Sequence, residues 1–226
     1  RERVMLTSAT ADAPDFLNPE IPEELPHLDM PVIVATDESL DGYGCLVEDY
    51  ENFPIEIVTW PTSGSRKVDE GTGNQGGTAE GIFEFWWEGD VLWGRNNAVK
   101  DTYILGWSRN PEEADSKVAT REQDQVLLWH ANYHPDGGQL FYSLDGTPFM
   151  VPLALPGDDV QPEDFVSFYC DGTKGLYIHP SIWHEGVFPI GNTGRFYDRQ
   201  GKVHARVSVN FAVEFGMLLR VPLVAP

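Results

Sequence analysis

The sequence has few cysteines and few basic residues, and both shortages exclude classes of protein. Two cysteines, Cys45 and Cys170, in 226 residues do not make a disulfide scaffold, so both are expected as reduced thiols. Fifteen Lys and Arg stand against 36 Asp and Glu, which gives a formal net charge of -21, and the basic residues form no cluster. Nucleic acids and anionic membranes bind clustered positive charge, so neither is expected as a partner.

Long apolar runs are missing as well. No segment approaches the roughly 18 apolar residues of a membrane span, and the start of the chain lacks the apolar region of a signal peptide. These features predict a cytoplasmic protein without membrane contact.

Sustained helical periodicity is scarce, because 17 prolines and 22 glycines interrupt the chain every few residues. Residues 1–29 are expected to form an extended N-terminal arm. Over residues 30–226, short β-like runs alternate with turn signals, and hairpins are predicted at 88–90 and at 200–202. The pattern predicts a single all-β domain over 30–226, an antiparallel β-barrel or jelly roll.

Residues 62–80 form the one low-complexity stretch of the chain, with the sequence TSGSRKVDEGTGNQGGTAE. The composition indicates a mobile loop. A lid over the mouth of the barrel is the sharper alternative, because long loops often carry function.

Four of the six histidines fall in two short segments, His130 with His134 and His179 with His184. Residues two apart in a strand share a face, so Asn132 and His134 can both point into a barrel. Gln139 and the distant His184 can add donors to the same lumen. Imidazole nitrogens with an oxygen donor suit Mn, Fe, Ni or Zn, whereas structural zinc would require more cysteines.

The two histidine segments resemble the two sequence motifs of the cupin superfamily. In the first, Asn132-x-His134, Gln139 and Gly146 match a frame of a His-x-His pair, a carboxylate and a glycine. Asn132 stands where that frame has a histidine, and Gln139 stands where it has a glutamate.

A more specific resemblance lies within that superfamily. The strings HPDGGQLF (134–141) and GLYIHPSIWH (175–184) look like the signature of the ureidoglycolate lyases. The likeness extends over roughly residues 31–215 and departs at Glu185 and Gly186, where that family has His-Pro.

The resemblance implies a cupin-type barrel with defined roles for eight residues. A divalent metal ion, with Mn, Fe, Ni or Zn as candidates, would be held by His134, Gln139 and His184. Acid–base catalysis near neutral pH is implied for His130 and His179. Contacts with a small carboxylate substrate are implied for Tyr142, Tyr177 and Arg206. The resemblance also implies a homodimer and a place in allantoin degradation within purine catabolism.

Each of these residues has a structural alternative. His134 and His184 can be barrel histidines satisfied by hydrogen bonds, and Gln139 can bond the backbone of the lumen. His130 can lie at the surface, and Arg206 can face outward from the barrel.

The implied function is that of a carbon–nitrogen lyase that releases urea and glyoxylate from ureidoglycolate or a similar small carbinolamide acid. One alternative is another metal-dependent cupin enzyme, such as a dioxygenase, a sugar isomerase or a lyase of a different small acid, since one fold hosts many chemistries. Another is a non-catalytic metabolite-binding cupin.

Overall fold

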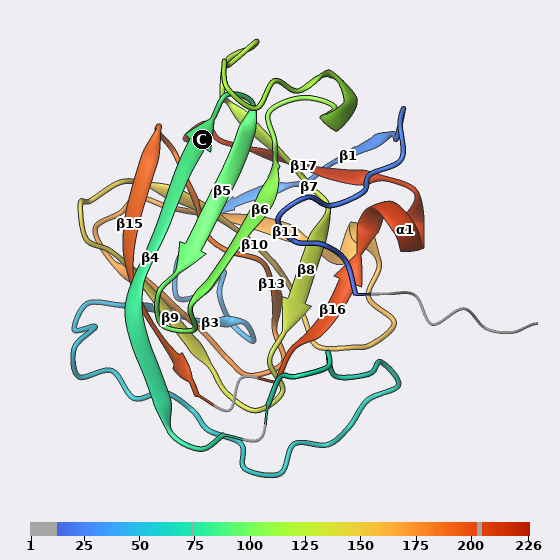
Figure 1. Ribbon diagram of the computed structural model, residues 1–226. Helices are drawn as coiled ribbons and strands as arrows, with labels where there is room; N and C mark the ends of the chain where they lie inside the picture. The colour runs from blue at the N-terminus through green and yellow to red at the C-terminus, as the bar shows by residue number, and fades with distance from the viewer. Residues whose placement is uncertain (1–12, 74, 203–204) are drawn as a thin grey trace, which may run out of the picture.

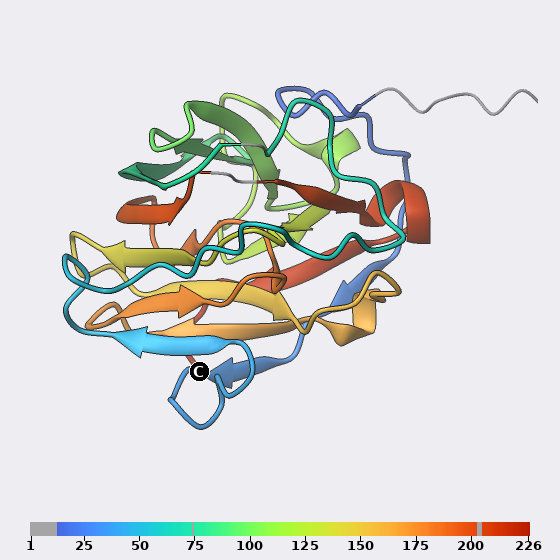
Figure 2. The same ribbon diagram turned by 90° about the horizontal axis from the view of Figure 1, so that it is seen from below.

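The computed structural model describes residues 13–73, 75–202 and 205–226. Over these residues the chain forms two β-sheets that pack around one core, seen from two directions in Figures 1 and 2. Helix in the described part is limited to α1 (Phe211–Phe215) and two single 3-10 turns, Pro111–Glu113 and Pro162–Asp164. The predicted all-β class is confirmed, and the two sheets are consistent with a cupin-type barrel or jelly roll.

The larger sheet has ten strands. They are β1 (His27–Asp29), β3 (Gly44–Val47), β4 (Thr78–Glu88), β5 (Val91–Asn96), β6 (Asp101–Trp107), β7 (Gln125–Leu128), β9 (Gln139–Ser143), β12 (Gly175–Ile178), β15 (Thr193–Gly201) and β17 (Leu218–Pro222). Their order across the sheet is β1-β17-β7-β6-β5-β4-β15-β9-β12-β3.

The smaller sheet has seven strands. They are β2 (Val32–Val34), β8 (His130–Tyr133), β10 (Phe149–Ala154), β11 (Val166–Cys170), β13 (Trp183–His184), β14 (Phe188–Pro189) and β16 (Val207–Asn210). Their order is β16-β8-β13-β10-β11-β2, with β14 also paired to β10.

Apolar side chains between the sheets form the core. All six residues of β10 are buried, and Phe141 of β9 and Phe196 of β15 are completely inaccessible to solvent. Burying one such side chain stabilises the fold by about 1.5–3 kcal/mol. The two-residue period of β9 and β15 sends these rings inward and leaves the alternate residues for the outer face.

One predicted hairpin is confirmed and the other is wrong. Strands β4 and β5 pair in antiparallel fashion around Gly89, whose φ of 56° suits glycine. In contrast, β15 and β16 belong to different sheets, so 200–202 is not a hairpin turn. After β16 the chain forms α1. The side chain of Asn210 caps this helix by accepting a hydrogen bond from the Val213 amide at 3.2 Å.

The described part of the N-terminal arm packs against the larger sheet. The Ile104 amide donates to the Phe16 carbonyl at 2.9 Å, and β1 pairs in parallel with β17. Residues 1–12 of the expected arm lie outside the described residues.

The segment 62–77 has no regular secondary structure in its described residues and contacts the chain at and beside β16. The Arg66 amide donates to Asp158 at 2.7 Å, and the Asp69 amide donates to the Arg206 carbonyl at 2.7 Å. Residues 78–80, at its predicted end, already belong to β4.

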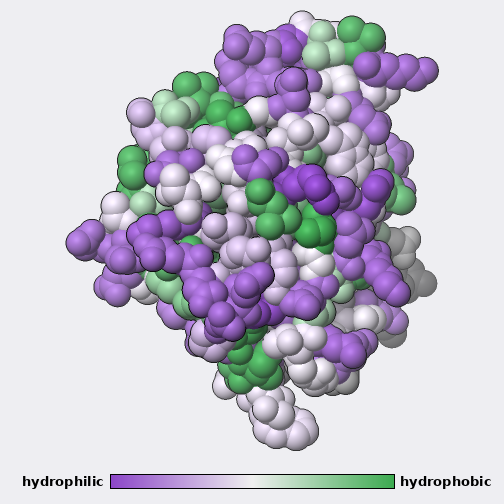
Figure 3. All heavy atoms as spheres, turned by 90° about the vertical axis from the view of Figure 1, so that its left-hand side faces the viewer, coloured by the Kyte–Doolittle hydropathy of each residue, from purple (hydrophilic) through white to green (hydrophobic). Residues whose placement is uncertain are grey.

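Exposed apolar side chains occur at scattered positions, such as Leu17 and Val118, and in a short run at Ile57, Val58 and Trp60. On the face in Figure 3, hydrophobic atoms form small separate patches among hydrophilic ones. Scattered apolar side chains of this kind need no partner to cover them. The described residues also include no helix long and apolar enough to cross a membrane.

Candidate active site

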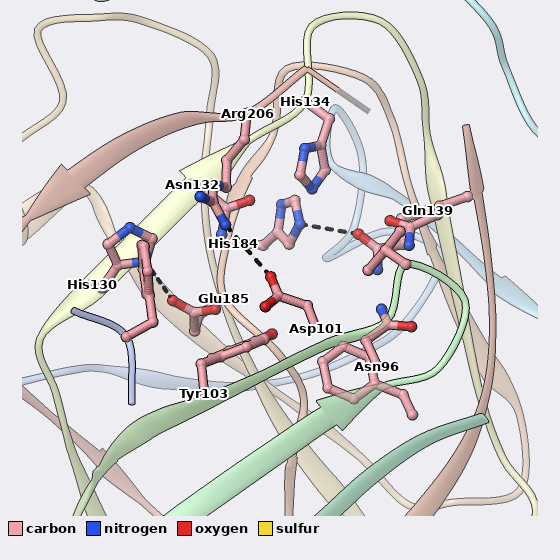
Figure 4. Close-up of a pocket in the computed structure, with 14 residues that line it drawn as sticks. Asn96, Asp101, Tyr103, His130, Asn132, His134, Gln139, His184, Glu185 and Arg206 are labelled. Atoms are coloured by element: carbon pink, nitrogen blue, oxygen red, sulfur yellow. Dashed lines mark hydrogen bonds and ion pairs between the residues drawn. The ribbon is translucent and has the colours of Figure 1, made fainter. Parts of the chain in front are cut away.

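A small pocket lies where the two sheets face each other, and most of the polar groups predicted from sequence meet there (Figure 4). Strands β8 and β13 of the smaller sheet contribute one wall, and β5, β6 and β9 of the larger sheet contribute the other. Its volume is about 40 Å³. A space of this size holds a few water molecules.

Strand β8 delivers three polar residues to the pocket. His130 and Asn132 share one face of the strand, and His134 follows directly after its end. The His134 and His184 rings lie with their centroids 5.0 Å apart, although the residues are fifty positions apart in sequence. The Nδ1 atom of His134 is 2.9 Å from the Ala205 carbonyl, so Nδ1 carries the proton there.

Gln139 links His184 to a buried carboxyl group. Its Oε1 lies 3.1 Å from His184 Nε2, and its Nε2 donates to Asp198 Oδ1 at 2.7 Å. Asn96 donates to the other oxygen of Asp198 at 3.2 Å. Burial raises the pKa of Asp198 to about 7, against the opposing effect of these two hydrogen bonds.

The protonation of His184 decides which way the Gln139 amide is oriented in this network. The His184 Nδ1–H donates to the Ile182 carbonyl at 2.9 Å, and burial lowers the pKa of the imidazole. The Nε2 atom of a neutral His184 accepts a hydrogen bond. In that state the NH₂ group of Gln139 must face His184, and a protonated Asp198 must donate to the amide oxygen. The two orientations of the amide thus correspond to a proton on Asp198 or on His184.

A second buried pair stands on the other side of the pocket. His130 Nδ1 lies 2.7 Å from Glu185 Oε2, and the two side chains are 3% and 5% exposed. A carboxylate only accepts, so His130 Nδ1–H donates to it, and in the neutral ring the lone pair is then on Nε2. His130 Nε2 and Asn132 Oδ1 are buried and have no hydrogen-bond partner among the described residues. Both atoms are therefore available to a ligand in the pocket.

Arg206 reaches the pocket from the residue before β16. Its Nε donates to Asp69 at 2.8 Å, and its Nη1 is 3.7 Å from an oxygen of Asp101. The guanidinium carbon lies 4.8 Å from the centre of the Phe16 ring. Arg206 thus faces the pocket, but its charge is already compensated.

Three residues predicted for the site lie elsewhere. Strand alternation places Tyr142 and Tyr177 on the outer face of the larger sheet, where Tyr142 stacks on Tyr50 and Tyr177 packs with Leu140. The structure therefore does not bring these tyrosines to the pocket, and their predicted contact with substrate stays a prediction.

His179 also lies away from the pocket. His179 follows the end of β12, and its side chain is 44% exposed. It bonds Glu56 at 2.6 Å on the surface instead of lining the pocket.

Several pocket residues were not predicted from sequence. Glu185 lines the pocket beside His184, because β13 ends at His184 and strand alternation does not extend past the strand. Asp198 shares a strand face with the buried Phe196. A single carboxyl group on such an apolar face could have indicated a pocket residue from the sequence. Asp101 and Phe16 come from distant segments and have no such signal.

The predicted metal ligands His134, Gln139 and His184 lie together, but their donor chemistry fits a divalent cation poorly. Gln139 offers a neutral oxygen in place of a carboxylate, and this amide is already bonded to His184 Nε2. Among the described residues no three His, Cys, Asp or Glu side chains are grouped to hold a metal ion. The metal stays a prediction, and the chemistry below uses only residues of the chain.

Residues 120–211 match the family model described as ureidoglycolate lyase. The family resemblance is confirmed. The ureidoglycolate lyase of Azotobacter vinelandii is 36% identical over 70 residues, which are 30% of this chain and 42% of that protein. The ureidoglycolate lyase of Rhodobacter capsulatus is 41% identical over 63 residues, which are 28% of this chain and 38% of that protein.

The chain spans about two fifths of the length of these ureidoglycolate lyases. The matched part contains the three pocket histidines, together with Gln139, Asp198 and Arg206. Asp101, Tyr103 and Phe16, which line the facing side, lie outside it.

Proposed function

We propose that the pocket cleaves the carbon–nitrogen bond of ureidoglycolate, or of a similar small carbinolamide acid, and releases urea and glyoxylate. The observation that carries this proposal is the buried His130–Glu185 pair, both residues of which lie within the ureidoglycolate lyase match and line the pocket. The Nε2 atom of His130 has no hydrogen-bond partner among the described residues.

His130 acts as the general base and then as the general acid. Its Nε2 takes the proton of the substrate hydroxyl, and the oxygen electrons form the carbonyl of glyoxylate. The carbon–nitrogen bond breaks, its electron pair goes to the departing nitrogen, and that nitrogen receives the proton back from Nε2 to give urea. One proton is shuttled, so no further reactant is required.

Glu185 positions the base for both steps. Its carboxylate holds the Nδ1–H tautomer and stabilises the imidazolium that forms after proton transfer. Asn132 Oδ1 is an acceptor for an N–H of the ureido group, and Arg206 is a partner for the substrate carboxylate.

The test is incubation of the purified protein with ureidoglycolate while both urea and glyoxylate are followed. The expected result is equal release of the two products well above the spontaneous rate. Release at the spontaneous rate by a folded protein would remove this substrate.

Two alternative functions differ from this proposal in turnover and in metal requirement. A non-catalytic metabolite-binding cupin is favoured by the neutral Asn132 and Gln139, and it would bind ureidoglycolate without turnover. Another metal-dependent cupin enzyme would purify with a metal held by His134, Gln139 and His184 and would lose activity with a chelator. Metal analysis alongside the turnover assay separates these cases. The homodimer and the place in purine catabolism are proposals that rest on the same family resemblance.

A further inference from the structure

The guanidinium of Arg206 is held by a carboxylate of the chain itself. Asp69 Oδ2 accepts from Arg206 Nε at 2.8 Å and from the Ser208 hydroxyl at 2.6 Å. Asp101 lies at 3.7 Å on the pocket side of the same guanidinium. Arg206 is therefore paired with anions before any ligand arrives.

Asp69 belongs to the segment 62–77, which is fastened to β16 through this contact. The Asp69 amide donates to the Arg206 carbonyl at 2.7 Å, and the Arg206 amide donates to Thr72 Oγ1 at 3.1 Å. Arg66 fixes the same segment further along, in an ion pair of 2.8 Å with Glu214. The Asp69 carboxylate is thus one of the contacts that hold the segment.

Arg206 lies at the edge of a small pocket. The pocket volume is about 40 Å³, which holds a few water molecules. Arg206 and Phe16 both line it, with the guanidinium 4.8 Å from the centre of the ring. A ligand carboxylate that pairs with Arg206 therefore meets a guanidinium that Asp69 and Asp101 already pair.

We infer that Asp69 is a specificity-determining residue, whose carboxylate is exchanged for that of the ligand on Arg206. The inference rests on the proposed function only in taking the ligand to be a small carboxylate. A carboxylate ligand replaces one charge-assisted pair by another, so Arg206 is never left unpaired. The released Asp69, which is 27% exposed in its side chain, becomes hydrated at the surface.

A neutral ligand cannot make this exchange. It offers no anion to Arg206, so the Asp69 pair persists. The same device would therefore select carboxylates over neutral compounds of equal size.

The experiment measures binding of glyoxylate and of urea by calorimetry to the wild type, D69N and E214Q. In D69N glyoxylate is expected to bind roughly fivefold tighter, because the competing charge on Arg206 is gone, and urea binding is expected to stay unchanged. E214Q also removes one negative charge and one anchor of the segment but leaves the Arg206–Asp69 pair intact, so it is expected to bind glyoxylate like the wild type.

Hydrogen exchange supplies the second readout. Glyoxylate is expected to speed exchange of the Asp69 and Thr72 amides in the wild type, because the segment is released. Unchanged or weaker glyoxylate binding in D69N, equal tightening in E214Q, or a segment that glyoxylate does not loosen would each overturn the inference. Turnover of ureidoglycolate does not enter either readout, so failure of the proposed function is recognised separately.

Discussion

Two histidine–glutamate pairs of nearly equal length occupy opposite environments in this protein. His130 and Glu185 lie 2.7 Å apart at 3% and 5% exposure, whereas His179 and Glu56 lie 2.6 Å apart at 44% and 51% exposure. His179 belongs to one of the two strings that resemble the ureidoglycolate lyase signature, and His130 lies four residues before the other. The difference teaches that burial and a facing pocket, and not the distance between imidazole and carboxylate, separate a candidate catalytic pair from a surface ion pair.

The physical reason is the dielectric environment. An exposed pair is screened by water and contributes about 0–1 kcal/mol. In a buried pair the carboxylate has few other partners, so it orients the imidazole and stabilises its charged form strongly. The following predictions compare the two pairs, beginning with the largest expected effect.

Replacement of the two histidines is expected to give the greatest contrast. H130Q removes the proposed base, so kcat for ureidoglycolate should fall by roughly 10²–10⁴-fold. H179Q removes an exposed imidazole outside the pocket and should leave kcat within about twofold. Steady-state kinetics on both variants checks this, with circular dichroism to confirm folding. Equal losses in the two variants would remove the distinction between the pairs.

Replacement of the two glutamates is expected to give a smaller contrast in the same direction. E185Q leaves His130 in place but removes the charge that stabilises its imidazolium, so kcat should fall by roughly tenfold or more, with little change in KM. E56Q should leave both constants within about twofold. A KM effect in E185Q without a kcat effect would assign Glu185 to substrate binding instead of positioning.

The buried carboxyl of Asp198 extends the comparison to stability. Its pKa is about 7 in the fold and 3.8 as the ordinary value, so folding takes up a proton between these pH values. The free energy of unfolding should therefore decrease as the pH rises from about 4 to about 7, by at most ~4 kcal/mol from this group.

D198N should remove that part of the slope. Guanidinium denaturation at several pH values measures it, and the gap between the variant and the wild type should change steadily across this window. Curves that stay parallel from pH 4 to pH 7 would contradict the raised pKa.

The smallest effect is expected for Tyr177, whose hydroxyl donates to Glu56 at 3.0 Å beside the exposed pair. Y177F should cost about 1 kcal/mol of stability for the lost hydrogen bond and leave kcat/KM within about twofold. Thermal denaturation and kinetics on one preparation check both. A large rise in KM would restore Tyr177 as a substrate contact.

The sequence predicted the all-β class and much of one wall of the pocket. Two-residue periodicity is a local property, so it placed His130, Asn132 and His134 on one side of β8 before any coordinates. Motif likeness added Gln139 and His184, because the spacing of strands within a family is retained.

The rest depended on contacts that periodicity does not encode. The hairpin expected at 200–202 was wrong because the chain crosses from one sheet to the other there. Phe16 and Asp69 reach Arg206 from segments more than a hundred residues away, and a local pattern carries no information about such pairs. Glu185 was not predicted as a pocket residue, because β13 ends at His184 and strand alternation does not set the direction of the next side chain.

The account depends most directly on the protonation of His130. Nitrogen NMR of the imidazole, recorded above the pH at which it titrates, reports which ring nitrogen carries the proton. The account predicts a protonated Nδ1 bonded to Glu185 and a bare Nε2 facing the pocket, and E185Q should weaken this preference. A proton fixed on Nε2 in the wild type would leave the pocket without its proposed base and would contradict the account.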